Sequence, residues 1–327
     1  LETRGHTTRT RRLLQQTMDD ASSLTTSNLL DQAFQRAHDG GNHSAAAILG
    51  AQIGMRHLRQ NQIDDAETQF ETVLEHSRTA GDVGISARAL RMLAVVRMRK
   101  QPVDMRFREH LDESMQIAEQ HNLRTTRMKI HEAWGFYYAN YSDQNGDMDR
   151  AESEYAQAIA LCRDLNDNDT LAFLLLSMGG LKMMREKVNQ AEIFYREALL
   201  LAETLNKRPQ LGLTNQGLWE VANNREQWED AQRYLTTGLA HFAAGGLSFY
   251  LQRWVQEALG TRYYIPAAHV ITALETIQQQ VPAQLSNEEA VAIAADMTSK
   301  AQAYYESQGH TTDYQQLRSY VRAHNLA

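Results

Sequence analysis

A short polar motif recurs at intervals of about 40 residues, and this recurrence constrains the fold of the 327-residue chain more than any other feature. Its four copies are Asp64-Asp65-Ala66-Glu67, Asp149-Arg150-Ala151-Glu152, Asn189-Gln190-Ala191-Glu192 and Glu229-Asp230-Ala231-Gln232. In the first three, an Asp or Asn precedes a Glu by three residues, as in the capping box that starts a helix. We therefore expect three helix N-caps, at Asp64, Asp149 and Asn189. Apolar or small residues at i+4 and i+7 from each alanine then line one helical face.

A second helix is predicted upstream of each motif. A recurring position lies 16 or 17 residues before each of the four alanines and is occupied by Gly50, Trp134, Leu175 and Asn215, and packing positions follow three residues later. Weaker copies of the motif centre on Leu30, Phe107 and Ala267. The anchors at residues 30, 66, 107, 151, 191, 231 and 267 are 36 to 44 residues apart. We predict seven helix pairs.

Several residues of these pairs match a known repeat consensus: Trp134, Tyr138, Tyr141, Gly54, Gly179, Phe70, Tyr155, Tyr195 and the four alanines. The pattern resembles the tetratricopeptide repeat family, although the consensus proline is missing and the period is longer than about 34 residues. A longer period also suits HEAT repeats, but the constant spacing inside each pair favours elongated tetratricopeptide-like repeats. The resemblance implies an all-α, right-handed α-solenoid over residues 1–282.

Predicted helix ends agree with this register. Residues that tolerate the left-handed C-cap conformation stand where second helices should end, at Gly40-Gly41, Gly81, Asn122, Asn166 to Asn168, Asn206 and Gly245-Gly246. Beyond Pro282 the register fails. A capping box at Ser286 predicts a helix to about Gln308, Gly309 ends it, and a last helix covers about 312–323. We expect residues 283–327 to cap the stack as part of the same domain.

Composition excludes several classes of protein. With 43% apolar and 22% charged residues, the chain is typical of a soluble globular protein. Its longest apolar stretch, Leu171 to Leu181, is shorter than the roughly 20 residues of a membrane helix. The single cysteine, Cys162, cannot form an internal disulfide and is expected in the core, so we predict a cytoplasmic protein. The chain begins at Leu1 without methionine, which is consistent with a piece of a longer protein.

Motifs of catalysis are missing from the sequence. It has no phosphate-binding loop, no dinucleotide fingerprint and no nucleophile elbow, and Gly135 stands where a zinc protease pattern beginning at His131-Glu132 requires a second histidine. We therefore predict no enzyme, no cofactor and no metal.

The sequence contains one candidate metal site, a calcium-binding loop. Asp143, Asn145, Asp147, Asp149 and Glu154 match liganding positions of an EF-hand loop. However, Met148 replaces the obligatory glycine and Asp149 is expected to serve as an N-cap, so a plain turn is the favoured interpretation.

Aromatic residues are assigned to packing. Trp134, Tyr138 and Tyr141 share one helical face and match repeat positions, which favours a core role over a stacking platform. Trp219, Trp228 and Trp254 receive the same interpretation.

Charge is uneven along the chain. Residues 88–129 carry ten Lys or Arg against five Asp or Glu, in a chain whose net charge is −7. An acidic chain is a poor general nucleic-acid binder, although its basic segment could receive an acidic group or serve as a solvated face. If first helices line the concave side, Arg88, Arg91 and Val95 share a groove with apolar residues further along the chain. The predicted binding residues are Arg88, Arg91, Val95, Phe173, Leu176, Met183 and Gln216.

Two function classes remain from the sequence. The first is a non-catalytic module that binds a protein or an extended peptide, or an amphipathic small ligand. The second is a sensor segment of a larger regulator, since the repeats resemble the superhelical part of signal-transduction ATPases of the MalT type, and those of bacterial peptide-pheromone receptors. The lysine and asparagine pattern by which some tetratricopeptide proteins clamp a carboxylate is not matched, because Val95 and Phe136 stand where polar groups are expected.

Overall fold

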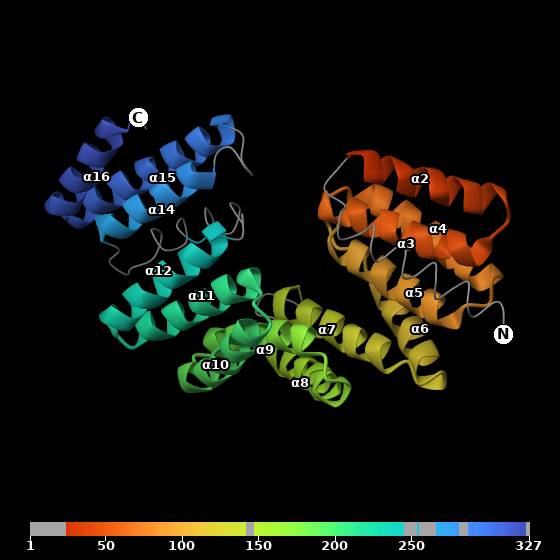
Figure 1. Cartoon of the computed structure of the whole chain (residues 1–327). Coiled ribbons are helices and arrows are strands. Elements are labelled where there is room, and N and C mark those ends of the chain that lie inside the picture. Colours follow the sequence, from red (N-terminus) through yellow and green to blue (C-terminus); the bar gives the residue numbers. More distant parts are fainter. Residues whose placement is uncertain (1–23, 142–146, 245–253, 255–265, 281–286, 325–327) are drawn as a thin grey trace. The chain divides into compact units, whose positions relative to one another are not determined.

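The computed structural model describes residues 24–141, 147–244, 254, 266–280 and 287–324, and their regular structure consists of 14 α-helices (Figure 1). Contacts between residues divide the chain into two compact units, residues 1–161 and 162–327. We call them unit 1 and unit 2, and describe each by itself.

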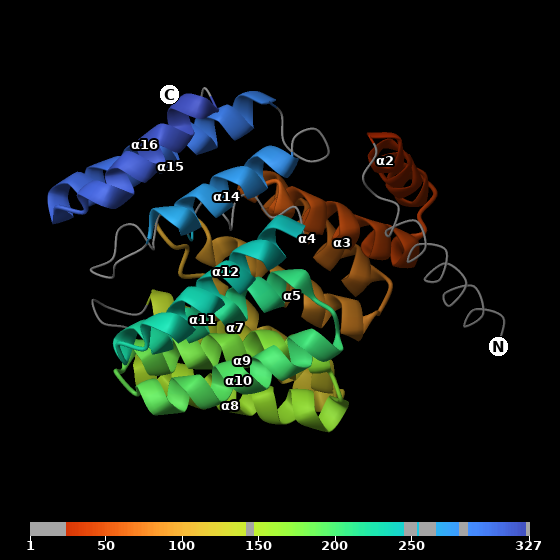
Figure 2. The same ribbon diagram turned by 60° about the vertical axis from the view of Figure 1, so that its left-hand side comes forward.

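Unit 1 is a series of helices in which each packs against the next (Figures 1 and 2). They are α2 (Leu24–Asp39), α3 (His43–Arg59), α4 (Ile63–Thr79), α5 (Val83–Met98), α6 (Phe107–Gln120) and α7 (Arg124–Asn140), and α8 (Met148–Leu165) begins in this unit and ends in the other. In addition, α3 packs against α5 and α5 against α7. The first helices of successive pairs therefore contact one another, as expected for a repeat array.

Unit 2 continues the same pattern and then departs from it. Its helices are α9 (Asn168–Met184), α10 (Val188–Thr204), α11 (Arg208–Asn224), α12 (Trp228–Ala244), α14 (Ala267–Gln280), α15 (Asn287–Gln308) and α16 (Thr311–Ala323). Figure 2 shows the last two lying along each other, with α14 beside them. One buried cluster joins Leu235 and Phe242 of α12 to Leu274, Tyr305 and Val321 of these last helices. A terminal pair that shares the core of the repeats removes an apolar end from water.

The predicted anchors are core residues. Ala66, Phe107, Ala151, Ala191 and Ala267 have no exposed surface, Ala231 is buried, and Leu30 of α2 is half-buried. Each begins or lies near the start of the second helix of a pair, so the predicted register is confirmed. Where the partner helix of α2 was expected, residues 1–23 lie outside the described part.

Close packing within a pair depends on small residues in first helices. A Cβ atom added at Gly54 would lie 2.8 Å from the ring of Phe70, and one added at Gly135 would lie 2.6 Å from the ring of Tyr155. Only glycine leaves room for an aromatic ring of the second helix at these positions, since real atoms do not approach so closely.

Backbone conformation confirms the helix ends. Gly41, Gly81, Asn122, Asn166, Asn206 and Gly309 all have φ between 50° and 72°. Asn61, Glu186 and Glu226, which end first helices, have the same conformation. The glycines and asparagines were recognisable because they tolerate this region, whereas glutamate rarely adopts it. Gly245-Gly246 and Ser286 lie outside the described residues.

The capping boxes predicted at Asp64, Asp149 and Asn189 are wrong. Helix α4 begins at Ile63 with Gln62 as its N-cap, and α10 begins at Val188 with Lys187 as its N-cap; neither cap makes a side-chain hydrogen bond. In α8 the side chain of Asp147, rather than Asp149, accepts from the backbone N–H of Arg150 at 3.1 Å. Asp64 and Asp149 lie in the first turns of their helices, where a negative charge still favours the helix dipole.

The predicted burial of the cysteine and of the aromatic residues is confirmed for some residues and wrong for others. Cys162, Trp219 and Trp254 are buried, as predicted. Trp134 and Tyr138 are half-buried against the cluster around Phe107 and Tyr137. Trp228 and Tyr141 are exposed, at 53% and 42%, so packing was the wrong assignment for them. Trp228 is the first residue of α12, where a side chain can point past the helix end instead of into the pair.

No described helix is long and apolar enough to span a lipid bilayer.

Candidate functional site

A groove in unit 2 collects most of the predicted apolar site. It has a volume of about 230 Å³ and is lined by Phe173, Leu176, Ser177, Tyr195, Leu213, Gln216, Gly217 and Glu220. Phe173, Leu176 and Ser177 belong to α9, Tyr195 to α10, and the rest to α11. Because α9 and α11 are first helices of neighbouring pairs and contact each other, their side chains can line one surface.

Two glycines let a tyrosine reach this groove. A Cβ atom at Gly179 of α9 would lie 2.5 Å from the ring of Tyr195, and so would one at Gly217 of α11. The ring therefore occupies the space that these glycines leave on both first helices. Gly180 differs, because a Cβ atom there would meet only the Tyr195 hydroxyl oxygen, at 3.9 Å.

The groove is apolar with a few polar groups. Phe173 is 45% exposed, while Leu176, Gln216 and Glu220 are half-buried. Burial raises the pKa of Tyr195, and the nearby carboxylate of Glu220 raises it further. The tyrosine hydroxyl therefore stays protonated and can donate a hydrogen bond near neutral pH. This combination of apolar wall and few polar groups is common in ligand-binding concavities.

Met183 lies outside this lining. Its side chain is half-buried against a cluster formed by Ala191, Tyr195, Leu218 and Val221, and Leu176 packs on the same cluster. Met183 therefore packs between helices, whereas Leu176 both packs and lines the groove.

The predicted basic residues lie in unit 1, on α5. Arg88 is exposed, and its Nε donates to the carbonyl oxygen of Gly84 at 3.3 Å. Arg91 is half-buried, and its Nη2 contacts the sulfur of Met92 at 2.9 Å. Burial lowers the pKa of Arg91; the carboxylate of Glu132 counteracts this effect, and Arg88 adds to it. Val95 is half-buried against the cluster around Met98 and Phe107.

The predicted set therefore falls into two groups. Phe173, Leu176 and Gln216 share one groove of unit 2, and Arg88 and Arg91 share one face of α5 in unit 1. The sequence missed Tyr195 as a groove residue, because its position after Ala191 identified it only as a packing residue of a second helix.

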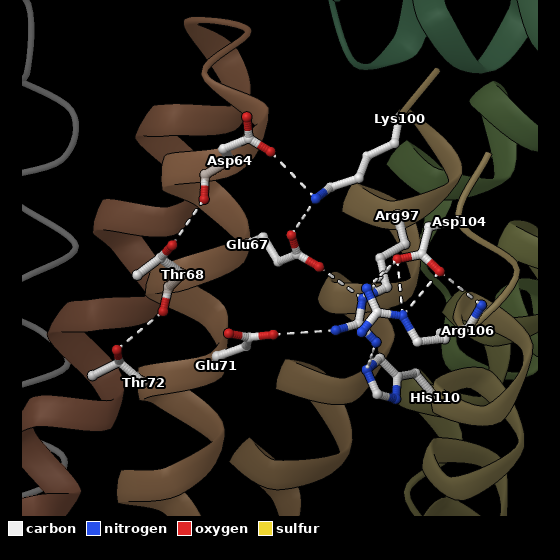
Figure 3. A network of polar contacts seen from close by, with 10 residues as sticks. All are labelled: Asp64, Glu67, Thr68, Glu71, Thr72, Arg97, Lys100, Asp104, Arg106 and His110. Atoms are coloured by element: carbon white, nitrogen blue, oxygen red, sulfur yellow. Dashed lines mark hydrogen bonds and ion pairs between the residues drawn. The ribbon is translucent and has the colours of Figure 1, made fainter. Parts of the chain in front are cut away.

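A polar network that the sequence did not reveal joins α4, α5 and α6 (Figure 3). Arg97 is 5% exposed, and its Nε donates to Glu67 at 2.8 Å while its Nη2 donates to Glu71 at 3.1 Å. Its Nη1 contacts Nε2 of His110. Since a guanidinium only donates, His110 must accept through Nε2 and be neutral, and burial and Arg97 lower its pKa.

Glu67 takes part in this network instead of capping α4, whose N-cap is Gln62. Glu67 also binds Lys100. Although burial raises the pKa of Glu67, the hydrogen bonds from Lys100 and Arg97 outweigh burial and lower it. In the same way, Glu192 of α10 binds Arg196 and Arg225 at 2.6 Å each.

The network borders a second hollow, of about 390 Å³. It is lined by Glu71, Leu74, Glu75, Arg78, Thr79, Leu93, Arg97 and His110. Three of its lining residues are already paired, since Arg97 binds Glu71 and Arg78 binds Glu113 at 2.5 Å.

The described residues contain no group of three or more potential metal ligands in coordinating geometry. Of the calcium-loop residues, Asp143 and Asn145 lie outside the described part. Asp147 caps α8, and Glu154 binds Nδ1 of His131 at 2.7 Å.

Two solved structures have a similar architecture. One is a signal transduction ATPase with numerous domains (STAND) protein with a tetratricopeptide repeat sensor from Pyrococcus horikoshii, with a TM-score of 0.60 and 13% sequence identity over 91% of this chain and 46% of that chain. The other is a Rap protein complexed with Competence and Sporulation Factor, with a TM-score of 0.54 and 14% identity over 86% of this chain and 75% of that chain.

The chain has a tetratricopeptide-like fold. It spans about half the length of the STAND protein. The sequence itself matches no protein-family model and no curated protein. The likeness concerns the tetratricopeptide-like architecture and agrees with the predicted helix pairs.

Proposed function

We propose that the chain is a non-catalytic module that binds a protein or peptide segment, with the groove between α9 and α11 as its recognition site. The observation that carries the proposal is the convergence of Phe173, Leu176 and Gln216 from two first helices around the hydroxyl-bearing ring of Tyr195. An exposed apolar wall with a few polar groups suits an extended segment that buries an apolar side chain and accepts hydrogen bonds.

The comparisons support a binding role. The Rap protein with a similar fold is complexed with a factor, and the repeats of the STAND protein are described as a sensor. Repeat arrays of this fold usually bind instead of catalysing, and the groove contains no nucleophile paired with a base among its lining residues.

The proposal is tested by selecting peptides from a random library on the immobilised chain and measuring their affinity by calorimetry. Phe173→Ala should weaken binding by roughly tenfold, because the cost of losing a buried aromatic side chain is about 1.5–3 kcal/mol. Leu176→Asp should abolish binding, because a carboxylate would then lie in the apolar wall.

Ile193→Asp is the matched control, since Ile193 is an apolar residue of α10 that is 65% exposed and does not line the groove. It should leave affinity unchanged. Circular dichroism checks that each variant is folded. If Phe173→Ala and Leu176→Asp proteins are folded and bind as well as the unmodified chain, the groove is not the recognition site.

A second function is favoured by the extent of the STAND match. Because that protein is about twice as long as the part this chain covers, we propose as the alternative that the chain is the ligand-sensing segment of a larger regulator. Reading the gene before Leu1 and after Ala327 tests it. An ATPase or DNA-binding domain on either side supports the sensor role, and stop signals on both sides exclude it.

A further inference from the structure

Arg91 is a partly buried guanidinium without an ion pair. Its Nε has no exposed surface and no hydrogen-bond partner, and its Nη2 contacts only the weakly accepting sulfur of Met92. Three other arginines of unit 1, Arg56, Arg78 and Arg97, each bind a carboxylate, whereas Nε of Arg127 is also buried without a hydrogen-bond partner. Among the described residues, no carboxylate forms an ion pair with Arg91.

The charges around Arg91 are mainly positive. Arg88 precedes it by one helical turn, and the facing helix α7 carries Lys129 and Glu132. Glu132 attracts Arg91 electrostatically, but its Oε2 is bound to Lys129 at 2.8 Å. Three cations, Arg88, Arg91 and Lys129, therefore lie near one carboxylate, Glu132, and that carboxylate already pairs with Lys129.

A buried charge without a partner is costly, whereas a charge-assisted hydrogen bond to an oxyanion compensates it. The Nε and Nη2 edge of arginine presents two parallel N–H groups, which match two oxygens of a carboxylate or phosphate. Arg91 as a whole is half-buried, so part of its side chain is exposed to solvent, whereas its Nε is covered and its Nη2 lies against the Met92 sulfur.

We propose that Arg91 is the centre of a binding site for one oxyanion, a carboxylate or a phosphate group, on the face of unit 1 formed by α5 and α7. Arg88 is the second cation of this site, and Glu132 competes with the bound anion. The inference goes beyond the proposed function, because it assigns a second binding site, in unit 1, and names the chemical class of its ligand.

The test observes the Nε–H signal of Arg91 by nitrogen-15 NMR of the full chain at low ionic strength. The signal is assigned by its loss in Arg91→Gln. Two probes are titrated: inorganic phosphate, and a capped tetrapeptide with a single aspartate. The same peptide with asparagine is the neutral control. We expect the two anions to shift the signal in a saturable way and the asparagine peptide to leave it unchanged.

The affinity of variant chains for the two anions tests the role of each residue. Arg91→Gln should weaken anion binding by roughly tenfold or more, the usual effect of losing a hydrogen bond to a charged group. Arg91→Lys, which keeps the charge but lacks the two-pronged edge, should also bind more weakly than the unmodified chain. Glu132→Gln should tighten binding, because it removes the competing carboxylate.

Arg78→Gln is the matched control, since Arg78 is an exposed arginine of unit 1 that binds Glu113 and lies on α4. It should leave anion affinity unchanged. Tighter binding of the aspartate peptide than of phosphate identifies a peptide carboxylate as the natural group, and the reverse order identifies phosphate.

The inference is overturned if neither anion shifts the Arg91 signal, or if folded Arg91→Gln binds both anions as well as the unmodified chain. Its failure is separate from that of the proposed function. Library peptides could lose affinity in Phe173→Ala while neither anion shifts the Arg91 signal. That result would support the groove as the peptide site and exclude the anion site.

Discussion

At the scale of single residues, two adjacent glycines of α9 have opposite structural roles. Gly179 lies against the ring of Tyr195 at a distance that excludes a methyl group, whereas Gly180 has space. Gly179→Ala should therefore lower the free energy of unfolding by about 1–3 kcal/mol through overpacking. Gly180→Ala should be neutral or stabilise by up to about 1 kcal/mol, because alanine favours helix. Chemical denaturation of both variants measures the difference.

Equal effects of the two alanine substitutions would contradict this packing of Tyr195. The same experiment concerns the groove, since a displaced Tyr195 ring would alter its lining. Loss of peptide affinity in Gly179→Ala without loss in Gly180→Ala would therefore connect the packing to the proposed binding.

A second residue-scale prediction concerns backbone conformation at a helix end. Gly81 has a φ of +68°, and a Cβ atom there would meet nothing within 4 Å. Gly81→Ala should therefore destabilise the chain by about 1–2 kcal/mol through backbone strain alone. Gly81→Asn should cost less, because asparagine tolerates the left-handed region. If thermal unfolding shows alanine and asparagine variants to be equally stable, strain at this position is not the cause.

At the scale of secondary-structure elements, the network of Arg97 joins α4, α5 and α6 (Figure 3). Arg97→Gln would leave Glu67 with Lys100 alone and remove the partner of Glu71, which should cost about 1.5–3 kcal/mol of stability, the usual effect of losing hydrogen bonds between charged groups. Arg106→Gln is the control: Arg106 binds Asp104 but its side chain is 62% exposed, so its loss should cost less than about 1 kcal/mol. Urea denaturation measures the free energy of unfolding of both variants. If Arg97→Gln lowers it as little as Arg106→Gln does, the network does not stabilise these helices.

At the scale of the whole molecule, buried histidines should make stability depend on pH. Burial lowers the pKa of His76, His110 and His241 from the ordinary value of 6.5. The neighbouring His38 and His43 lower that of His76 further, with ring nitrogens 2.9 and 2.8 Å from it. Each of the three stays neutral in the folded chain at a pH where the unfolded chain already binds a proton.

Stability should therefore be complete above about pH 7 and fall as the pH drops below 6.5, because proton binding favours the unfolded state in that range. Lowered pKa values of carboxylates such as Glu67 and Glu192 add a separate loss only at more acidic pH. Melting temperatures between pH 7.5 and 5 test this expectation. His110→Gln should reduce the slope, and a melting temperature independent of pH in this range would contradict it.

The sequence by itself determined the repeat. The alanine anchors, the glycines and asparagines of helix ends, and the terminal helices after Pro282 were all predictable, because helical periodicity and backbone preference are local properties. The predicted helix starts were wrong: Glu67 and Glu192 were expected to cap their own helices, but α4 and α10 begin before Asp64 and Asn189, and both carboxylates bind arginines from other parts of the fold.

Only the tertiary structure decided which residues share a site. Periodicity placed Phe173, Leu176 and Gln216 on first helices, but the depth of the groove depends on Tyr195 of a second helix and on two glycines that admit its ring. The missing ion pair of Arg91 is likewise a property of three dimensions, since its nearest carboxylate, Glu132, lies about 40 residues later in the sequence and is bound by Lys129. Packing and electrostatics join residues that are distant along the chain, so the spacing of residue types could indicate the surface but not its partners.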